Sequence, residues 1–246
     1  MNLLEEISLN AWPAHKMELY DGWLLRFSHN YTHRTNCVNP VAPSTLPLEE
    51  KVAFCEQEYR KMHTPAIFKI SPLLDPSIDE YLDRQGYVTE HTTEVMTMPL
   101  EHFKMVQNTG LVDLNDTITD EWISNLFQLN GTTNPTHLSI VPAMFKAIPK
   151  ETIVARIEIN GRMAASGLGI LDRQHAGIYA VYVDENYRRK GYARAICSAI
   201  LEAASHKGMT HAYLQVVKGN VNARHLYETL GFEYRYTYWF RSKPMI

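Results

Sequence analysis

Two stretches of the chain predict the same order of elements, and this internal repeat constrains the fold more than any other feature. Residues 48–98 and residues 192–241 each predict a helix, a strand, a short helix, a glycine followed by an aromatic residue, and a second strand. The sequence RQGY at 84–87 stands in the first copy where TLGF at 229–232 stands in the second. This repeated order predicts an α/β (α+β) chain built from two similar units.

The predicted elements divide the chain into two domains, residues 1–105 and residues 106–246. In each domain we expect a mixed, mostly antiparallel sheet flanked by helices. Asn160-Gly161 separates two strand-like runs, and this dipeptide favours the tight turn of an antiparallel hairpin because both positions need positive φ. Residues 130–150 predict a loop-rich segment of the kind that often holds a substrate.

Composition excludes several classes of protein. The chain is 45% hydrophobic with a net charge of −3, which argues against disorder, and no apolar run approaches the roughly 20 residues that span a bilayer. The acidic start MNLLEEISLNAW is unlike a signal peptide. We therefore expect a cytoplasmic protein with no membrane contact. No metal site is predicted, because Cys37, Cys55 and Cys197, and likewise His29 and His33, lack metal-ligand spacing.

Positive charge is concentrated in one loop of the second domain. Residues 1–105 carry 9 Lys and Arg against 15 Asp and Glu, whereas residues 106–246 carry 15 against 12. A nucleic-acid-binding protein needs a broader basic face, so no nucleic-acid partner is expected. The loop is either a solvated charge run or a site for a small anion. Its cations are Arg188, Arg189, Lys190 and Arg194.

The basic loop joins a predicted strand at 178–183 to a predicted helix at 192–206. A helix start presents unpaired N–H groups and a partial positive charge, and so it binds phosphate groups. Gly191 lets the backbone approach such a ligand closely, and Ala193 adds almost no bulk. The pattern R-x-x-G-x-A is weak evidence when taken alone.

A second motif, N-x-x-A-x-x-L-Y-x-x-x-G-F, begins at Asn220. Together the two motifs resemble the GNAT superfamily of acetyl-CoA-dependent N-acetyltransferases over roughly residues 113–246. The first domain resembles a degenerate copy of the same fold. It lacks the basic glycine loop and has Leu82 where the second copy has Tyr227, so we expect it to bind no CoA.

The resemblance implies a role for each matching residue. The loop amides would hold the CoA pyrophosphate, and the backbone of the preceding strand would pair with the pantetheine arm. Tyr227 would protonate the departing CoA thiolate. The residues that the resemblance assigns to the cofactor are Val181, Val183, Arg188, Arg189, Lys190, Gly191, Tyr192, Ala193 and Asn220.

Several of these residues have a purely structural alternative. Tyr227 fits a core position, Asn220 fits a helix cap, and Cys197 fits a packed apolar position better than a nucleophile. No residue stands out as the general base. Glu158 and the Asp172–His175 turn are the candidates.

These observations predict an acetyltransferase that uses acetyl-CoA and no metal. The acceptor would be a primary amine, and a small or amino-acid-like molecule is favoured over a protein lysine or N-terminus. Because no nucleophile is predicted at the site, the amine would attack directly in a ternary complex. The alternative is a CoA-binding module without catalysis that uses the paired domains for partner contact. We expect a monomer or a homodimer whose first domain shapes the acceptor pocket.

Overall fold

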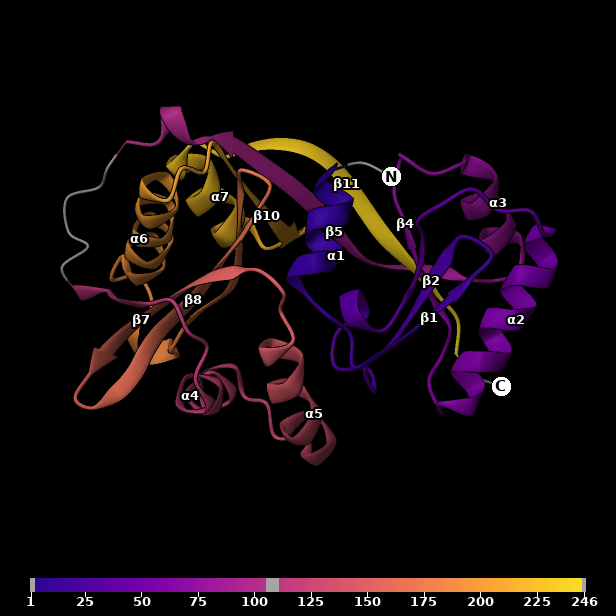
Figure 1. Cartoon of the computed structure of the whole chain (residues 1–246), viewed down its shortest axis with the longest axis horizontal. Coiled ribbons are helices and arrows are strands. Elements are labelled where there is room, and N and C mark those ends of the chain that lie inside the picture. Colours follow the sequence, from indigo (N-terminus) through magenta and orange to yellow (C-terminus); the bar gives the residue numbers. More distant parts are fainter. Residues whose placement is uncertain (1–2, 105–110, 245–246) are drawn as a thin grey trace.

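The computed structural model describes residues 3–104 and 111–244 as one mixed α/β structure (Figure 1). The predicted domain boundary at 105/106 lies outside the described residues. The strands of the described chain are β1 (Lys16–Tyr20), β2 (Trp23–Phe27), β3 (Val38–Pro40), β4 (Ile67–Ile70), β5 (Val88–Pro99), β6 (Asp113–Asn115), β7 (Glu151–Ile159), β8 (Arg162–Asp172), β9 (His175–Val183), β10 (His211–Val217) and β11 (Glu233–Ser242). The α-helices are α1 (Leu3–Ala11), α2 (Leu48–Lys61), α3 (Pro76–Arg84), α4 (Asp120–Asn130), α5 (Pro135–Lys146), α6 (Tyr192–His206) and α7 (Val221–Leu230).

The internal repeat is confirmed in the order of elements and in their detail. The order α2-β4-α3-β5 in the first half matches α6-β10-α7-β11 in the second. The N–H of Tyr87 donates to the carbonyl oxygen of Leu82 at the end of α3, and the N–H of Phe232 donates to that of Tyr227 at the end of α7, both at 3.0 Å. The glycine before each aromatic residue has positive φ, 80° and 101°, as this helix ending requires.

The predicted α/β fold with a mixed, mostly antiparallel sheet is confirmed, and the strands of the two halves join in one continuous sheet. The strand order is β1-β2-β3-β4-β11-β5-β10-β9-β8-β7-β6. β3 pairs with β4 and β9 with β10 in parallel, and the other neighbours are antiparallel. Apart from the edge strand β6, which has no counterpart, this order is symmetric about the β11–β5 pair. The two halves have exchanged their last strands, because β11 lies beside β4 and β5 lies beside β10 (Figure 1).

Helices cover both faces of the second half of the sheet. On one face, α6 and α7 enclose a buried core that includes Ile196, Ile200 and Leu230. On the other face, α1, α4 and α5 enclose a second core that includes Ile7 and Trp122. A helix of the first half therefore packs against the sheet together with helices of the second half.

The segment 130–150 is not loop-rich as expected, because α5 fills most of it. Asn134 caps this helix by accepting a hydrogen bond from the N–H of Thr136 at 2.9 Å, and Pro135 occupies the first helical position. Pro142 lies inside α5 and removes one backbone donor there, which is why the sequence favoured a loop. The hairpin at Asn160-Gly161 is confirmed, with φ of 52° and 72°.

We find in the described residues no helix that is both long enough and apolar enough to cross a lipid bilayer.

Candidate cofactor and acceptor site

The central feature of the site is the separation of β9 and β10. The two strands pair in parallel from His175 and His211 as far as Ile178 and Leu214. β9 then continues to Val183 without a partner on its β10 side. In an open α/β sheet, the place where parallel strands separate at their carboxyl ends is a common ligand site.

A β-bulge shapes β9 just beyond the point of separation. Ser166 of β8 pairs with Tyr182, but Leu168 pairs with Tyr179, so β9 has one extra residue here. Ala180, in the bulge, has a φ of 48°, and its carbonyl oxygen accepts a hydrogen bond from the Ser166 hydroxyl at 2.9 Å. Bulges bend a strand and redirect its side chains, and they are frequent next to active sites.

The predicted glycine loop has the geometry of an anion site. Gly191 stands immediately before α6 with a φ of 82°, a conformation that side-chain-bearing residues rarely adopt. A Cβ atom added at Gly191 would meet no other atom within 4 Å. The backbone at the start of α6 is therefore open to a ligand, and its N–H groups carry the positive end of the helix dipole.

The loop cations are mostly left without an acidic partner. Arg188 is paired with Glu185 at 3.3 Å. Within the described chain, Arg189 instead contacts the amide oxygen of Asn222 at 3.4 Å, and the Lys190 ammonium lies 4.9 Å from the Tyr187 ring. The surplus of positive charge favours an anionic group at the start of α6.

Asn220 lies on the other side of the separated strands, at the end of β10. Its side chain caps α7 by accepting a hydrogen bond from the N–H of Ala223 at 3.2 Å. The structural alternative for Asn220 is therefore present in the structure, and a contact with the cofactor stays a prediction.

Tyr227 is buried between α7 and the sheet, with 9% of its surface exposed. It belongs to a buried core against which the partly buried Val181, Val183 and Tyr192 pack, so the predicted catalytic residue and three predicted cofactor residues border the same core. Burial raises the pKa of the Tyr227 hydroxyl well above its usual range. The phenol therefore keeps its proton at neutral pH and is available as a donor.

Cys197 is fully buried in α6, and burial raises the pKa of its thiol to about 12. A thiol of this kind is not a nucleophile at neutral pH. The assignment of Cys197 as a packed apolar residue is confirmed.

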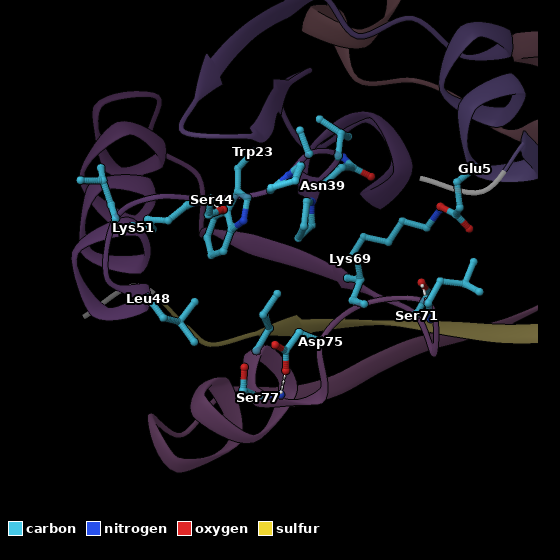
Figure 2. A pocket seen from close by; sticks show the side chains of 18 of the residues that line it. Glu5, Trp23, Asn39, Ser44, Leu48, Lys51, Lys69, Ser71, Asp75 and Ser77 are labelled. Atoms are coloured by element: carbon cyan, nitrogen blue, oxygen red, sulfur yellow. Dashed lines mark hydrogen bonds and ion pairs between the residues drawn. The ribbon is translucent and has the colours of Figure 1, made fainter.

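The first half has a cleft of about 820 Å³ at the equivalent place, between β3 and β4 (Figure 2). The two strands pair only at Val38 and Phe68, so they also separate early. Helix α2 starts after Pro47, without a side-chain cap, and carries Glu49 and Glu50 in its first turn. These features oppose an anion at the helix start, in contrast to the basic loop before α6.

A carboxylate of the protein itself occupies the loop before α2. Asp21, from the β1–β2 turn, accepts hydrogen bonds at 3.0 Å from the N–H groups of Thr45 and Leu46. The Lys51 ammonium lies 3.3 Å from the same carboxylate, and these hydrogen bonds, that of Leu46 first, hold the pKa of Asp21 well below its usual range. Two N–H groups of this loop, those of Thr45 and Leu46, are thus already bonded to a carboxylate. This supports the prediction that the first half binds no CoA.

A small cavity borders β9 on the face opposite α6, and we call it the acceptor cavity. Its volume is about 60 Å³. Both halves of the chain line it, because Tyr31 and Arg34 come from the first half and Tyr182 from β9. A smaller cavity of about 20 Å³ shares Trp12, Arg34 and Tyr179 with it and reaches Gln215 of β10. No local pattern in the sequence marks Trp12, Tyr31 or Arg34, so sequence analysis missed them.

The predicted candidates for the general base do not line either cavity. Asp172 lies at the opposite end of β9, where it accepts a hydrogen bond from Asn10 at 2.9 Å and pairs with Lys150 at 3.0 Å. Glu158 is paired with Arg156 at 3.2 Å near the β7–β8 turn. Among the described residues, neither cavity is lined by a carboxylate or an imidazole.

One cluster of metal-ligand residue types forms in the first half. The ligand atoms of His33, Glu90 and His91 lie within 4.8 Å of one another, and these groups could hold a cation. His33 and Glu90 are far apart in the sequence, so spacing alone could not reveal the cluster. The absence of a metal stays a prediction.

Comparison with known proteins gives the family. Residues 1–240 match the family described as "Probable histone acetyltransferase Rv0428c C-terminal". The chain belongs to this family. It is a GNAT acetyltransferase, as the two motifs predicted.

Relatives of this N-acetyltransferase match either most of the chain or about a third of it. An uncharacterized N-acetyltransferase, YobR of Bacillus subtilis, is 24% identical over 234 residues, which is 93% of each chain. The [Ribosomal protein bS18]-alanine N-acetyltransferase of Escherichia coli K12 is 33% identical over 73 residues, 30% of this chain and 49% of that protein.

Solved structures of the same fold include one described as a tandem GNAT protein. A GCN5-related N-acetyltransferase from Kribbella flavida has a TM-score of 0.70 at 13% identity, covering 100% of this chain and 97% of that one. A tandem GNAT protein from the clavulanic acid biosynthesis pathway has a TM-score of 0.61 at 14% identity, with 80% and 70% covered. The GNAT fold of this N-acetyltransferase is therefore clear.

Proposed function

We propose that this N-acetyltransferase transfers the acetyl group of acetyl-CoA to the primary amine of a small, amino-acid-like molecule. One observation carries the proposal. The separated strands β9 and β10 lie between an open, basic helix start on one side and the acceptor cavity on the other. This arrangement suits a donor with phosphate groups and an acceptor that meets it at the β9 bulge.

The residues at the start of α6 fit acetyl-CoA. The helix start offers backbone N–H groups beside Arg189 and Lys190, and Gly191 leaves the room that a pyrophosphate needs. The unpaired edge of β9 at Val181 and Val183 suits an extended pantetheine arm, which can pair with it as a further strand does. When bound, acetyl-CoA supplies an activated acyl group as a thioester.

Transfer requires that the amine attack the thioester carbonyl directly. A C–N bond forms, the C–S bond breaks, the amine loses a proton and the thiolate gains one. Tyr227 is the proposed proton donor to sulfur, because its buried phenol stays protonated. Because no carboxylate or imidazole of the described chain lines the cavities, we propose that the amine proton leaves through water.

The size of the acceptor cavity favours a small acceptor. A volume of about 60 Å³ holds roughly four to six water-sized groups, which matches a small amino acid better than a folded protein surface. A protein N-terminus is the second class, and the name of the E. coli relative describes an acceptor of this kind. It would enter with only its first residue in the cavity.

The test is a screen of amines with acetyl-CoA in which free thiol is measured. We expect thiol release that depends on one class of small amine and is lost in Tyr227→Phe. A protein that binds acetyl-CoA but releases no thiol above the hydrolysis background with any small amine or N-terminal peptide would be a binding module without catalysis.

A further inference from the structure

Two guanidinium groups lie at the acceptor side of the site without a carboxylate partner. Arg34 lines both the acceptor cavity and the smaller cavity, and Arg26 lines the smaller one. In the described chain neither side chain forms an ion pair, whereas Lys69, the third cation at the smaller cavity, pairs with Glu5. Buried charges in proteins are normally paired, so this surplus of positive charge is unusual.

Arg26 lies deep in the structure, with 2% of its surface exposed. Its guanidinium donates to two backbone carbonyl oxygens, that of Arg34 at 2.6 Å and that of Trp12. Its Nε atom is buried without a hydrogen-bond partner among the described residues. Burial lowers the pKa of Arg26, and the nearby charge of Arg34 contributes to the same direction. An anion between the Arg26 and Arg34 side chains would offset both the burial of the Arg26 charge and its repulsion from Arg34.

Arg34 lies over the point where β9 and β10 separate. Its guanidinium donates one hydrogen bond, at 3.1 Å, to the side-chain oxygen of Gln215, which follows the last paired residue of β10. A guanidinium has five N–H donors in a planar fork, and this one makes no other hydrogen bond through its side chain within the described residues. Most of the fork is thus available to a ligand.

The loop that carries Arg34 is held in place by hydrogen bonds within the first half of the chain. The side-chain oxygen of Asn36 accepts hydrogen bonds from the N–H groups of Ser28 at 2.9 Å and Asn30 at 3.2 Å. Arg26 anchors the same loop through the Arg34 carbonyl oxygen. A binding group on a fixed loop loses little entropy when a ligand arrives.

We propose that Arg34 binds a carboxylate of the acceptor, with Arg26 adding positive charge behind it, so that the acceptor is a small amino acid. The proposal rests on the proposed function and names its substrate class. A carboxylate accepts two parallel hydrogen bonds from a guanidinium fork, an arrangement that neutral groups cannot match. The amine of the same molecule then remains inside the cavity that borders Ala180 and Tyr182, next to the β9 segment where the thioester is expected.

The experiment compares each amino acid with its own amide, which keeps the amine and the side chain but removes the negative charge. Alanine, serine and threonine and their amides are tested with acetyl-CoA by thiol release, on the full-length wild type, Arg34→Gln and Arg34→Lys. Arg235→Gln is the control, because Arg235 is exposed on β11 and lines neither cavity. Binding of the same six compounds is measured in parallel by calorimetry in the presence of CoA.

We expect the wild type to prefer at least one amino acid to its amide by tenfold or more in kcat/KM. Arg34→Gln should remove this preference mainly through a higher KM for the amino acid, so that the acid becomes no better a substrate than its amide, and circular dichroism shows that the variant folds. Arg34→Lys should keep part of the preference, and Arg235→Gln all of it. Acetylation of amides as fast as acids by the wild type, or an unchanged preference in Arg34→Gln, would overturn the proposal and leave the proposed function standing.

The calorimetric arm covers the case in which no tested compound releases thiol. Amino acids that bind the wild type but not Arg34→Gln would then still support a carboxylate site. If none of the amino acids binds, the carboxylate proposal is wrong. Failure of the transferase assignment itself appears only in the wider amine screen, so the two failures are distinguishable.

Discussion

At the scale of single residues, Tyr227 and Leu82 occupy equivalent positions in the two halves, and only Tyr227 carries an aromatic ring with a hydroxyl group. Both are buried, and both carbonyl groups accept the same hydrogen bond at the end of their helices. Packing therefore does not require the hydroxyl of Tyr227, since leucine serves in the other copy. The hydroxyl is better explained by chemistry at the separated strands.

Tyr227→Phe keeps the ring and removes the proton donor. We expect kcat to fall by roughly 10- to 1,000-fold with little change in the KM for acetyl-CoA, because the donor acts as charge develops on sulfur. Since burial raises the Tyr227 pKa, the pH–rate profile should show no loss of activity from its ionisation up to pH 9. Single-turnover rates measure the effect, and Tyr234→Phe, an exposed tyrosine on β11, is the control. If Tyr227→Phe has the wild-type single-turnover rate, Tyr227 has a packing role and not a catalytic one.

Asp21 gives a prediction about stability and acid. Its folded pKa is depressed below the unfolded value of about 3.9, so it stabilises the fold above about pH 4 and this contribution is lost as pH falls further. The melting temperature of the wild type should therefore drop more steeply between pH 5 and pH 2 than that of Asp21→Asn. Asp116→Asn should retain the steep dependence of the wild type. If the melting temperatures of the wild type and Asp21→Asn fall equally between pH 5 and pH 2, the role of Asp21 in the loop is contradicted.

At the scale of elements, the two loop–helix junctions before α2 and α6 show how one fold is used in two ways. Before α6 the loop is basic and open, whereas before α2 it contains prolines and is filled by the carboxylate of Asp21. The sequence predicted the first junction correctly, since glycine, cations and helix start are contiguous. It could not predict the Asp21 contact, because that residue comes from a different hairpin.

Gly191→Glu tests the loop before α6. The added side chain places bulk and negative charge where phosphate groups are expected, so the Kd for acetyl-CoA should rise at least tenfold, about 1.4 kcal/mol. Gly208→Glu is a matched control. Gly208 lies just after the C-terminal end of α6 with a φ of 80°, and a Cβ atom added there, as at Gly191, meets no other atom within 4 Å. Gly208→Glu introduces the same backbone strain and the same negative charge, but at a position outside the loop before α6. Calorimetry that finds equal affinity in a folded Gly191→Glu variant would remove the loop from the cofactor site.

The extent of α5 shows where prediction of secondary structure from the sequence failed. The region around α5 has Pro142 and a polar start, which favour a loop, but apolar residues recur along it at Val141, Met144 and Phe145. These side chains are buried against the sheet, and burial outweighs the cost of one proline. The hairpin at Asn160-Gly161 and the helix cap at Asn220 could be predicted because their signals are local.

At the scale of the whole molecule, the exchanged strands β5 and β11 join the halves. Each half could be recognised from its own sequence, but the strand exchange could not. A fold in which each half keeps its own last strand and one in which the halves exchange these strands place the same residues in equivalent surroundings. The acceptor cavity was missed for the same reason. Arg34 and Tyr182 meet only after the halves pack together.

This arrangement predicts that neither half is complete alone. A fragment of residues 1–104 leaves β4 without β11 and β5 without both of its neighbours, β10 and β11, so three strand edges lose their partners. We expect it to self-associate and to lack the cooperative thermal transition of the full chain. Mixing it with a fragment of residues 111–246 should restore a 1:1 complex with native circular dichroism. Sedimentation velocity is the measurement, and a monomeric 1–104 fragment that melts like the intact protein would contradict the expectation.

The exchange also affects synthesis on the ribosome. β4 cannot pair with its second neighbour, β11, until Glu233–Ser242 has been made. At a translation rate of 5 to 20 residues per second, the interval between completion of β5 and completion of β11 is roughly 7 to 30 s. During this time the nascent first half presents an unpaired edge, so protection of that edge by the ribosome or a chaperone would determine how much of the newly made enzyme reaches its final sheet.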